Sequence, residues 1–221
     1  MKRKKKLYPD SGVELNPFIA KNYDRVMNAG TLGMYKSFIY KAINDMNILP
    51  GDQILDMGCG SGRNAYLMSR YLNDQGQLTG LDISEHMEKH FHRKFKNDKR
   101  VETFNQRIDQ PFNLQKVYDK VFISFVIHGF PHEIRDIVIQ NAYGHLKPGG
   151  SFFILDFAEF DMAKMPLLHR VIFKKIECKY AFDFIKRDWK EILKAYDFVT
   201  FHEHFYFKNY VRLLHAVKNE R

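Results

Sequence analysis

The stretch that decides the fold of this chain is Ile54-Leu55-Asp56-Met57-Gly58-Cys59-Gly60-Ser61-Gly62. An apolar run ends in an acid, glycines follow at alternate positions, and a helical segment opens at Arg63. Alternating glycines let the backbone reverse tightly and let a ligand approach without meeting a Cβ atom. The amide groups at the start of the following helix would then face that ligand. The stretch therefore predicts a strand, a ligand-binding turn and a helix.

Two kinds of nucleotide site begin with such a turn. The dinucleotide fingerprint has the pattern G-x-G-x-x-G and holds a pyrophosphate on the helix N-terminus. Here the third glycine comes one residue early, Arg63 stands in its place, and Asp56 lies two residues before the first glycine. An acid at that position would repel a pyrophosphate but suits a cationic ligand. S-adenosylmethionine, with an ammonium and a sulfonium group, is the better match, and a glycine turn without any ligand is the alternative.

Apolar and helical segments alternate along the chain. Strands are expected at 53–57, 77–81, 101–104, 120–125 and 151–157, and helices at 63–72, 85–95 and 132–145. This alternation indicates an α/β fold with a doubly wound parallel sheet. The segment 147–150 (Lys-Pro-Gly-Gly) predicts a turn just before the fifth strand, and residues 198–207 and 210–217 predict a C-terminal hairpin.

The chain of 221 residues is long enough for one sizeable domain. Residues 1–15 are expected to form a basic arm, because five of the first six residues are lysine or arginine. Residues 16–221 would form a single domain, in which 16–48 make an N-terminal helical cap and 158–190 a lid region. The formal net charge of +9 favours an anionic partner, either nucleic acid or an anionic membrane surface.

Several classes of protein are disfavoured by the composition. No apolar stretch approaches the roughly 20 residues that cross a bilayer, and the basic N-terminus lacks the apolar region of a signal peptide. Two cysteines, Cys59 and Cys178, make neither a disulfide framework nor a metal cluster. The cytoplasm is therefore the expected compartment, with peripheral contact at the inner membrane face as an option.

The chain resembles the class I S-adenosylmethionine-dependent methyltransferases. Within them it is most similar to the ubiquinone/menaquinone-biosynthesis C-methyltransferases and neighbouring lipid methyltransferases. The resemblance rests on the glycine turn, on Ala20-Lys21-Asn22-Tyr23-Asp24 and on Leu146-Lys147-Pro148-Gly149-Gly150-Ser151. It implies a mostly parallel seven-stranded sheet with an antiparallel C-terminal hairpin. It also implies methyl transfer by in-line displacement to a small lipophilic acceptor, such as a quinone precursor or a phospholipid headgroup.

Two segments depart from that family pattern. Gln106 stands where the family has an acid that contacts the adenine amino group, so adenine recognition would rest on Ile108 packing and on Asp109 or backbone groups. After the fourth expected strand, the chain reads His128-Gly129 where quinone methyltransferases tend to have an Arg-Asn pair. The second departure weighs against a quinone as the acceptor.

The resemblance places the cofactor against the tips of the first two strands. Asp56 would attract the methionine ammonium group, and Gly58 and Gly60 would allow close approach of the backbone. Asp82 would accept both ribose hydroxyls, since a carboxylate has two oxygens suited to a diol. The other expected cofactor-binding residues are Tyr23, Cys59, Ile83, Ile108, Asp109 and Ser124.

Two histidines are candidates for a catalytic base. His128 and His132 follow the fourth expected strand, beside the expected methyl position. An imidazole can remove a proton from the acceptor at neutral pH. Surface or core histidines without a catalytic role are the alternative. His86 and His90, spaced i,i+4, have no third ligand nearby in the sequence, so they are interpreted as a solvated helix face and no metal is expected.

Residues 160–190 mix apolar and cationic side chains, which predicts a helix with one apolar and one cationic face. Such a helix is typical of membrane surfaces, and a lid packed on the core is the alternative. Two other functions remain open besides lipophilic methylation. RNA methylation would use the same positive charge, but the chain lacks an Asn-Pro-Pro-Tyr-type motif and a recognisable RNA-binding module. A non-catalytic S-adenosylmethionine-binding subunit would need only the glycine turn and Asp82.

Overall fold

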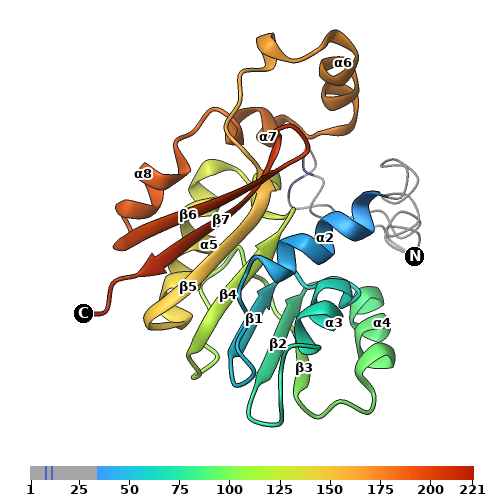
Figure 1. Ribbon diagram of the computed structural model, residues 1–221, viewed down its shortest axis with the longest axis vertical. Coiled ribbons are helices and arrows are strands. Elements are labelled where there is room, and N and C mark those ends of the chain that lie inside the picture. Colours follow the sequence, from blue (N-terminus) through green and yellow to red (C-terminus); the bar gives the residue numbers. More distant parts are fainter. Residues whose placement is uncertain (1–7, 9–10, 12–33) are drawn as a thin grey trace.

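The computed structural model describes Tyr8, Ser11 and residues 34–221. The rest of the expected basic arm and the first part of the expected helical cap lie outside these residues. A seven-stranded sheet of order β3-β2-β1-β4-β5-β7-β6 crosses the molecule (Figure 1). Strands β1 to β5 run parallel, and β7 lies antiparallel to both β5 and β6. The predicted fold class is therefore confirmed, including the antiparallel C-terminal hairpin.

The elements follow the predicted order. The strands are β1 (Gln53–Met57), β2 (Gln77–Asp82), β3 (Val101–Asn105), β4 (Tyr118–Ser124), β5 (Leu146–Phe157), β6 (Phe198–Tyr206) and β7 (Val211–Lys218). The helices are α2 (Met34–Asn44), α3 (Arg63–Ser69), α4 (Glu85–Phe95), α5 (His132–His145), α6 (Leu167–Ile176), α7 (Lys179–Phe184) and α8 (Trp189–Lys194). Two short 3₁₀ turns are η1 (Ile127–Gly129) and η2 (Met162–Lys164).

Period-two alternation in the central strands builds two cores, one on each face of the sheet. In β1, Leu55 and Met57 belong to the core covered by α5 and α8, whereas Ile54 belongs to the core covered by α2, α3 and α4 (Figure 1). Successive side chains of a strand point to opposite faces, so a strand covered on both sides is apolar throughout. This double cover leaves the carboxyl ends of the parallel strands as the open edge where ligands bind in such sheets.

The predicted turn at 147–150 is wrong in its placement, because these residues lie within β5. The register with β4 advances from the pair Leu146–Tyr118 to the pair Ser151–Lys120. Five steps on β5 therefore match two steps on β4, and the extra residues form a bulge. Gly149 has a φ of +72°, and a Cβ atom on Gly150 would lie 2.9 Å from the carbonyl oxygen of Lys147. The glycines bend the strand after it has begun pairing.

Gly62 closes the turn in front of α3 with a φ of +74°, and a Cβ atom there would lie 2.7 Å from Phe91 and 2.8 Å from Phe95. We expect Gly62→Ala to lower the free energy of unfolding by about 1–3 kcal/mol, because it combines backbone strain with a clash against α4. Gly144→Ala is the matched control, since nothing lies within 4 Å of its Cβ position. Removing a glycine from a helix there is expected to raise stability by about 0.5–1 kcal/mol. Equal urea midpoints for the two variants would contradict this explanation.

Candidate functional site

The glycine turn is locked onto the end of β2 by its own amides. Gly58, Gly60 and Gly62 have φ values of 82°, 53° and 74°, which residues other than glycine rarely adopt. The amides of Gly58 and Cys59 donate to the carbonyl oxygen of Leu81 at 2.8 and 2.9 Å. The amide of Gly60 donates to the Asp82 carboxylate at 2.9 Å. These bonds bring the tips of β1 and β2 together.

Asp56 lies beneath this turn and is an unusual core residue. Its side chain is 1% exposed, and Oδ2 has no hydrogen-bond partner among the residues that the structure describes. Burial and the neighbouring Asp82 raise the pKa of Asp56 to about 8. A buried polar atom left without a partner costs roughly 1–3 kcal/mol. Its position beneath the turn, next to Asp82, therefore suits a cationic group of a ligand, which would satisfy the carboxylate.

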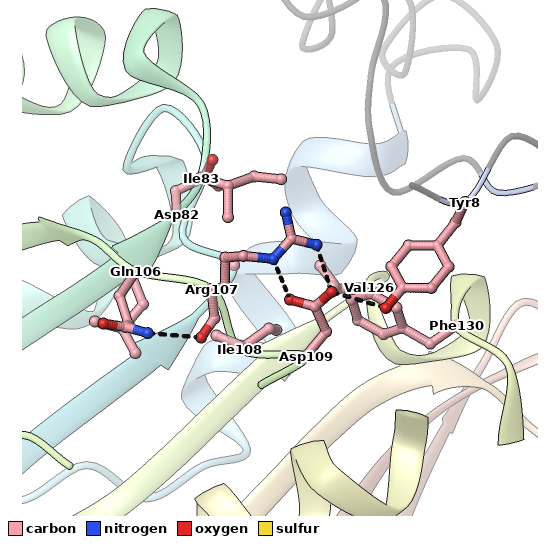
Figure 2. Close-up of a pocket in the computed structure, with 11 residues that line it drawn as sticks. Tyr8, Asp82, Ile83, Gln106, Arg107, Ile108, Asp109, Val126 and Phe130 are labelled. Atoms are coloured by element: carbon pink, nitrogen blue, oxygen red, sulfur yellow. Dashed lines mark hydrogen bonds and ion pairs between the residues drawn. The ribbon is translucent and has the colours of Figure 1, made fainter. Parts of the chain in front are cut away.

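A cavity of about 60 Å³ opens beside the turn (Figure 2). The residues that line it are Tyr8, Gly58, Leu81, Asp82, Ile83, Gln106, Arg107, Ile108, Asp109, Val126 and Phe130. Five of the predicted cofactor-binding positions, Gly58, Asp82, Ile83, Ile108 and Asp109, are thus brought together in one place. A Cβ atom on Gly58 would lie 2.8 Å from Val126 Cγ2, so only glycine leaves this wall undisturbed.

Asp82 points its carboxylate at the cavity from the end of β2. Its Oδ2 accepts from the Gly60 amide, and its Oδ1 accepts from the Ser84 amide at 2.8 Å. A carboxylate has about four lone-pair sites, so each oxygen can accept one further hydrogen bond. Burial raises the pKa of Asp82, while the amide hydrogen bonds oppose that shift. The two remaining sites match the two hydroxyls of a ribose diol.

The opposite wall of the cavity contains residues that sequence reasoning did not single out. The Arg107 guanidinium forms an ion pair with Asp109, with Nε 2.9 Å from Oδ1. The Tyr8 hydroxyl donates to Asp109 Oδ2 at 2.8 Å, and the Tyr8 ring packs edge-on against Phe130 (Figure 2). Ser11 extends this contact by donating to the Gly129 carbonyl oxygen at 2.5 Å. Nothing in the sequence pattern indicates that Tyr8, about a hundred residues away, contacts Asp109.

Four described residues among the predicted cofactor positions, Asp56, Cys59, Gly60 and Ser124, do not line the cavity. The Cys59 thiol points under the turn, where it lies 3.8 Å from Thr103 Oγ1 and fills the space beside Gly80. Ser124 ends β4 opposite Leu155 and stays outside the lining. Tyr23 lies outside the described residues. The cofactor-binding roles assigned to these residues therefore stay predictions.

His128 occupies η1, shortly after β4, and its ring is held through one nitrogen. Its Nδ1 lies 2.7 Å from Asp156 Oδ1, and its backbone amide donates to Asp156 Oδ2 at 3.3 Å. Its Nε2 lies 3.6 Å from Glu177 Oε2. Burial lowers the pKa of His128, but Asp156 and Glu177 outweigh burial, so the pKa is raised above its usual value. Asp156, which had no assigned role, thus orients the ring, and His128 itself does not line the cavity.

A buried arginine joins the His128 turn to the lid region. The guanidinium of Arg135, 0% exposed, donates to the carbonyl oxygens of Ile127 and His128. It also donates to the Tyr180 carbonyl oxygen and forms an ion pair with Asp183 at 2.7 Å. The backbone that carries His128 is therefore fixed to α7.

The other predicted base, His132, is the first residue of α5. Its Nδ1 is buried and has no hydrogen-bond partner in the part of the chain that the structure describes. His86 and His90 lie on the exposed surface of α4 with their Nε2 atoms 3.2 Å apart. No group of three or more potential metal ligands is found within residues 34–221, Tyr8 and Ser11.

A chain of aromatic rings leads from His128 to α6. The Phe157 ring lies 5.1 Å from the His128 ring and 5.0 Å from Phe173 of α6, centre to centre. Phe173 in turn lies 5.6 Å from Phe160 and 5.7 Å from Phe182. We call Phe157, Phe160, Phe173 and Phe182 the aromatic wall. It gives the region beside the imidazole an apolar surface.

Comparison with known proteins agrees with this geometry. Residues 54–150 match the family model described as a methyltransferase domain. The chain is 26% identical over 157 residues to a demethylmenaquinone methyltransferase of Staphylococcus aureus (strain JH9), which covers 71% of this chain and 64% of the relative. It is 29% identical over 133 residues to that of Staphylococcus carnosus (strain TM300), covering 60% and 54%. The chain thus spans less than two thirds of the length of these relatives.

Solved structures share the fold. An O-methyltransferase family protein from Burkholderia thailandensis superposes with a TM-score of 0.65 at 17% identity, covering 88% of this chain and 59% of that one. A SAM-dependent methyltransferase from Aquifex aeolicus superposes with a TM-score of 0.57 at 16% identity, covering 81% and 88%. The matched residues 54–150 contain the glycine turn, Asp56 and Asp82. Residues 54–150 therefore match a methyltransferase domain, and the fold of the chain is similar to that of S-adenosylmethionine-dependent methyltransferases.

Proposed function

We propose that this protein binds S-adenosylmethionine over the tips of β1 and β2 and transfers its methyl group to a small lipophilic acceptor. The observation that carries the proposal is the buried, unpartnered carboxylate of Asp56, which lies beneath the turn and neighbours Asp82, a residue that lines the cavity. An anionic ligand would be repelled by Asp56, whereas the ammonium group of S-adenosylmethionine would pair with it. Asp82 would hold the ribose hydroxyls, and Ile83 and Ile108 would contact the adenine.

The cofactor supplies a methyl group on a sulfonium sulfur that leaves as a neutral thioether. The protein therefore needs to position the acceptor, exclude water and accept a proton. His128 fits the last task because Asp156 fixes the ring through Nδ1 and leaves Nε2 pointing toward Glu177 and the lid region. His128 Nε2 would take the proton that the acceptor loses when it gains the methyl group.

The acceptor class follows from the aromatic wall and from the relatives. A flat apolar ring could stack against Phe157 beside His128. The relatives named above are demethylmenaquinone methyltransferases, although their identity to this chain is below 30%. Reduced demethylmenaquinone is therefore a suitable first probe. His128 is the favoured base over His132, because only His128 has a carboxylate that orients its ring.

We expect His128→Gln to lower kcat for methylation of reduced demethylmenaquinone by about 100-fold or more, the usual contribution of a positioned base. The assay follows labelled methyl groups into the organic phase, and calorimetry should show unchanged S-adenosylmethionine affinity. His132→Gln is the matched control and should retain nearly full activity. Wild-type turnover by His128→Gln would overturn this role.

The rate should rise with pH through an inflection above the usual pKa of histidine, because His128 must be neutral to accept a proton and its pKa is raised. Removing the Glu177 carboxylate takes away a group that stabilises the charged imidazole, so Glu177→Gln should move the inflection to lower pH. An inflection that stays in place in this variant would show that Glu177 does not act on the base.

The assay also separates the other functions that the sequence left open. Label in RNA but not in the organic phase would favour RNA methylation. Tight cofactor binding without methyl transfer to any component of a lipid extract would favour a non-catalytic subunit.

A further inference from the structure

Helix α6 projects from the body of the molecule, beyond α7 and away from the central sheet (Figure 1). Its inward side makes aromatic contacts with the rest of the protein. Phe173 packs against Phe157, Phe160 and Phe182, and His169 lies 6.2 Å from the Tyr210 ring. The helix is therefore anchored on one side and open on the other.

The open side carries large apolar residues. Leu167 is 68% exposed, Leu168 69% and Val171 42%. Among the described residues, ten large apolar side chains are exposed, and these three are the only group of three on one helix. Such clustered exposure is a mark of an interaction site, whereas single exposed apolar residues are ordinary.

Cationic residues lie on the same side. With 3.6 residues per turn, Lys174, Leu167, Val171, Lys175 and Leu168 occupy neighbouring directions over roughly a third of the helix surface. Lys174 and Lys175 are exposed, and neither forms an ion pair with any residue that the structure describes. The prediction of one apolar and one cationic face is therefore wrong. Phe173 provides the inward contact instead, and the leucines share the outward side with the lysines. We call Leu167, Leu168, Val171, Lys174 and Lys175 the α6 face.

We propose that the α6 face docks this protein onto an anionic membrane surface. Leucine and valine side chains would enter the boundary between headgroups and acyl chains, while the lysine stems extend to the phosphates. Positive charge complements anionic lipid, which favours this occupant over a second copy of the same cationic face. No helix within the described residues is long and apolar enough to cross a membrane.

The position of α6 connects docking to the proposed acceptor. Phe173 of α6 packs on Phe157, which contacts the His128 ring. Glu177, the residue that caps the end of α6, faces His128 Nε2. A lipophilic acceptor leaving the bilayer beside α6 would therefore meet the aromatic wall and the base first. This link rests on the proposed function, whereas docking itself can be measured without any acceptor.

The test is sedimentation of the full chain with vesicles of phosphatidylglycerol and phosphatidylcholine, or of phosphatidylcholine alone, at low salt. We expect binding to the anionic vesicles only. The double variants Leu167→Gln/Leu168→Gln and Lys174→Glu/Lys175→Glu should each weaken binding at least about tenfold, because a few apolar side chains or charges dominate interfacial binding.

Two double variants serve as matched controls. Lys96→Glu/Lys99→Glu makes the same charge change on exposed residues of the loop after α4, and Leu49→Gln/Val199→Gln removes exposed apolar residues elsewhere. Both should bind vesicles like the wild type. Equal losses in the controls would show a general attraction of a basic protein to lipid and would overturn the proposal. The proposal would also be overturned if the wild type did not bind vesicles. It would equally be overturned if the protein formed a dimer without lipid and Leu167→Gln/Leu168→Gln abolished that dimer.

Calorimetry with S-adenosylmethionine separates this proposal from the proposed function. Intact cofactor binding and methyl transfer to detergent-dispersed demethylmenaquinone, without vesicle binding, would overturn only the docking. Vesicle binding that needs the α6 face, without cofactor binding, would support docking and overturn the proposed methyl transfer.

Discussion

Replacing Asp56 by asparagine is expected to have two effects of opposite sign: weaker cofactor binding and a more stable ligand-free protein. The affinity for S-adenosylmethionine should fall by about 10- to 100-fold, because a buried charge-assisted contact is worth roughly 1.5–3 kcal/mol. Wild-type affinity should increase as pH rises toward 8, where Asp56 becomes ionised. The variant, which does not titrate at this position, should lack that increase. Calorimetry at pH 6 and pH 8 measures both affinities.

The stability effect follows from the raised pKa of Asp56. The folded protein keeps the Asp56 proton up to about pH 8, whereas an unfolded aspartic acid loses it near pH 4, at a pKa of about 3.9. The folded state therefore binds more protons in this window, and this group makes stability fall as pH rises from about 4 to about 8. Asparagine lacks this loss, so the advantage of Asp56→Asn should grow across the window.

Thermal unfolding of the ligand-free proteins checks this expectation. The melting temperature of Asp56→Asn should exceed that of the wild type by about 5 °C at pH 8, which corresponds to roughly 1–3 kcal/mol in a chain of this size. Asp74→Asn, at an exposed position, is the matched control and should change neither property. A variant that binds the cofactor normally, or that melts below the wild type at pH 8, would contradict the role assigned to Asp56.

Asp82→Ala is expected to reduce S-adenosylmethionine affinity at least about 100-fold, because two charge-assisted hydrogen bonds to a diol contribute roughly 3 kcal/mol together. The variant also releases the Gly60 and Ser84 amides, which now bind the carboxylate at 2.9 and 2.8 Å. The turn would then lose its fixed position against β2. Calorimetry with S-adenosylmethionine gives the affinity directly.

A comparison of two ligands identifies which part of the cofactor Asp82 holds. S-adenosylmethionine and its 2′-deoxy analogue should bind Asp82→Ala with similar affinity, whereas the wild type should prefer the diol clearly. Asp98→Ala is the control, because its partner is Arg100, outside the residues that line the cavity. A wild-type protein that binds both ligands equally would overturn the ribose assignment.

Local patterns predicted most of the scaffold. The ranges of α4 and α5 coincide with the predicted 85–95 and 132–145, since apolar spacing and flanking polar residues define such helices. The positions of the glycine turn and of Asp82 could also be predicted from the sequence. They depend on local backbone conformation and on spacings within neighbouring strand–turn–helix units. The prediction of a turn at 147–150 was wrong because a pair of glycines is compatible with either a turn or a bulge. Only the register with β4 distinguishes them.

The amino-acid sequence by itself determined the class of fold, the glycine turn and the carboxylates at the tips of β1 and β2. Only the tertiary structure decided that Tyr8 reaches Asp109, that Asp156 orients His128, and that the leucines of α6 face outward. The physical reason is how far apart in the sequence the interacting residues lie. Backbone conformation and apolar periodicity are local properties, whereas a hydrogen bond across about thirty or a hundred residues exists only after the sheet has brought its partners together.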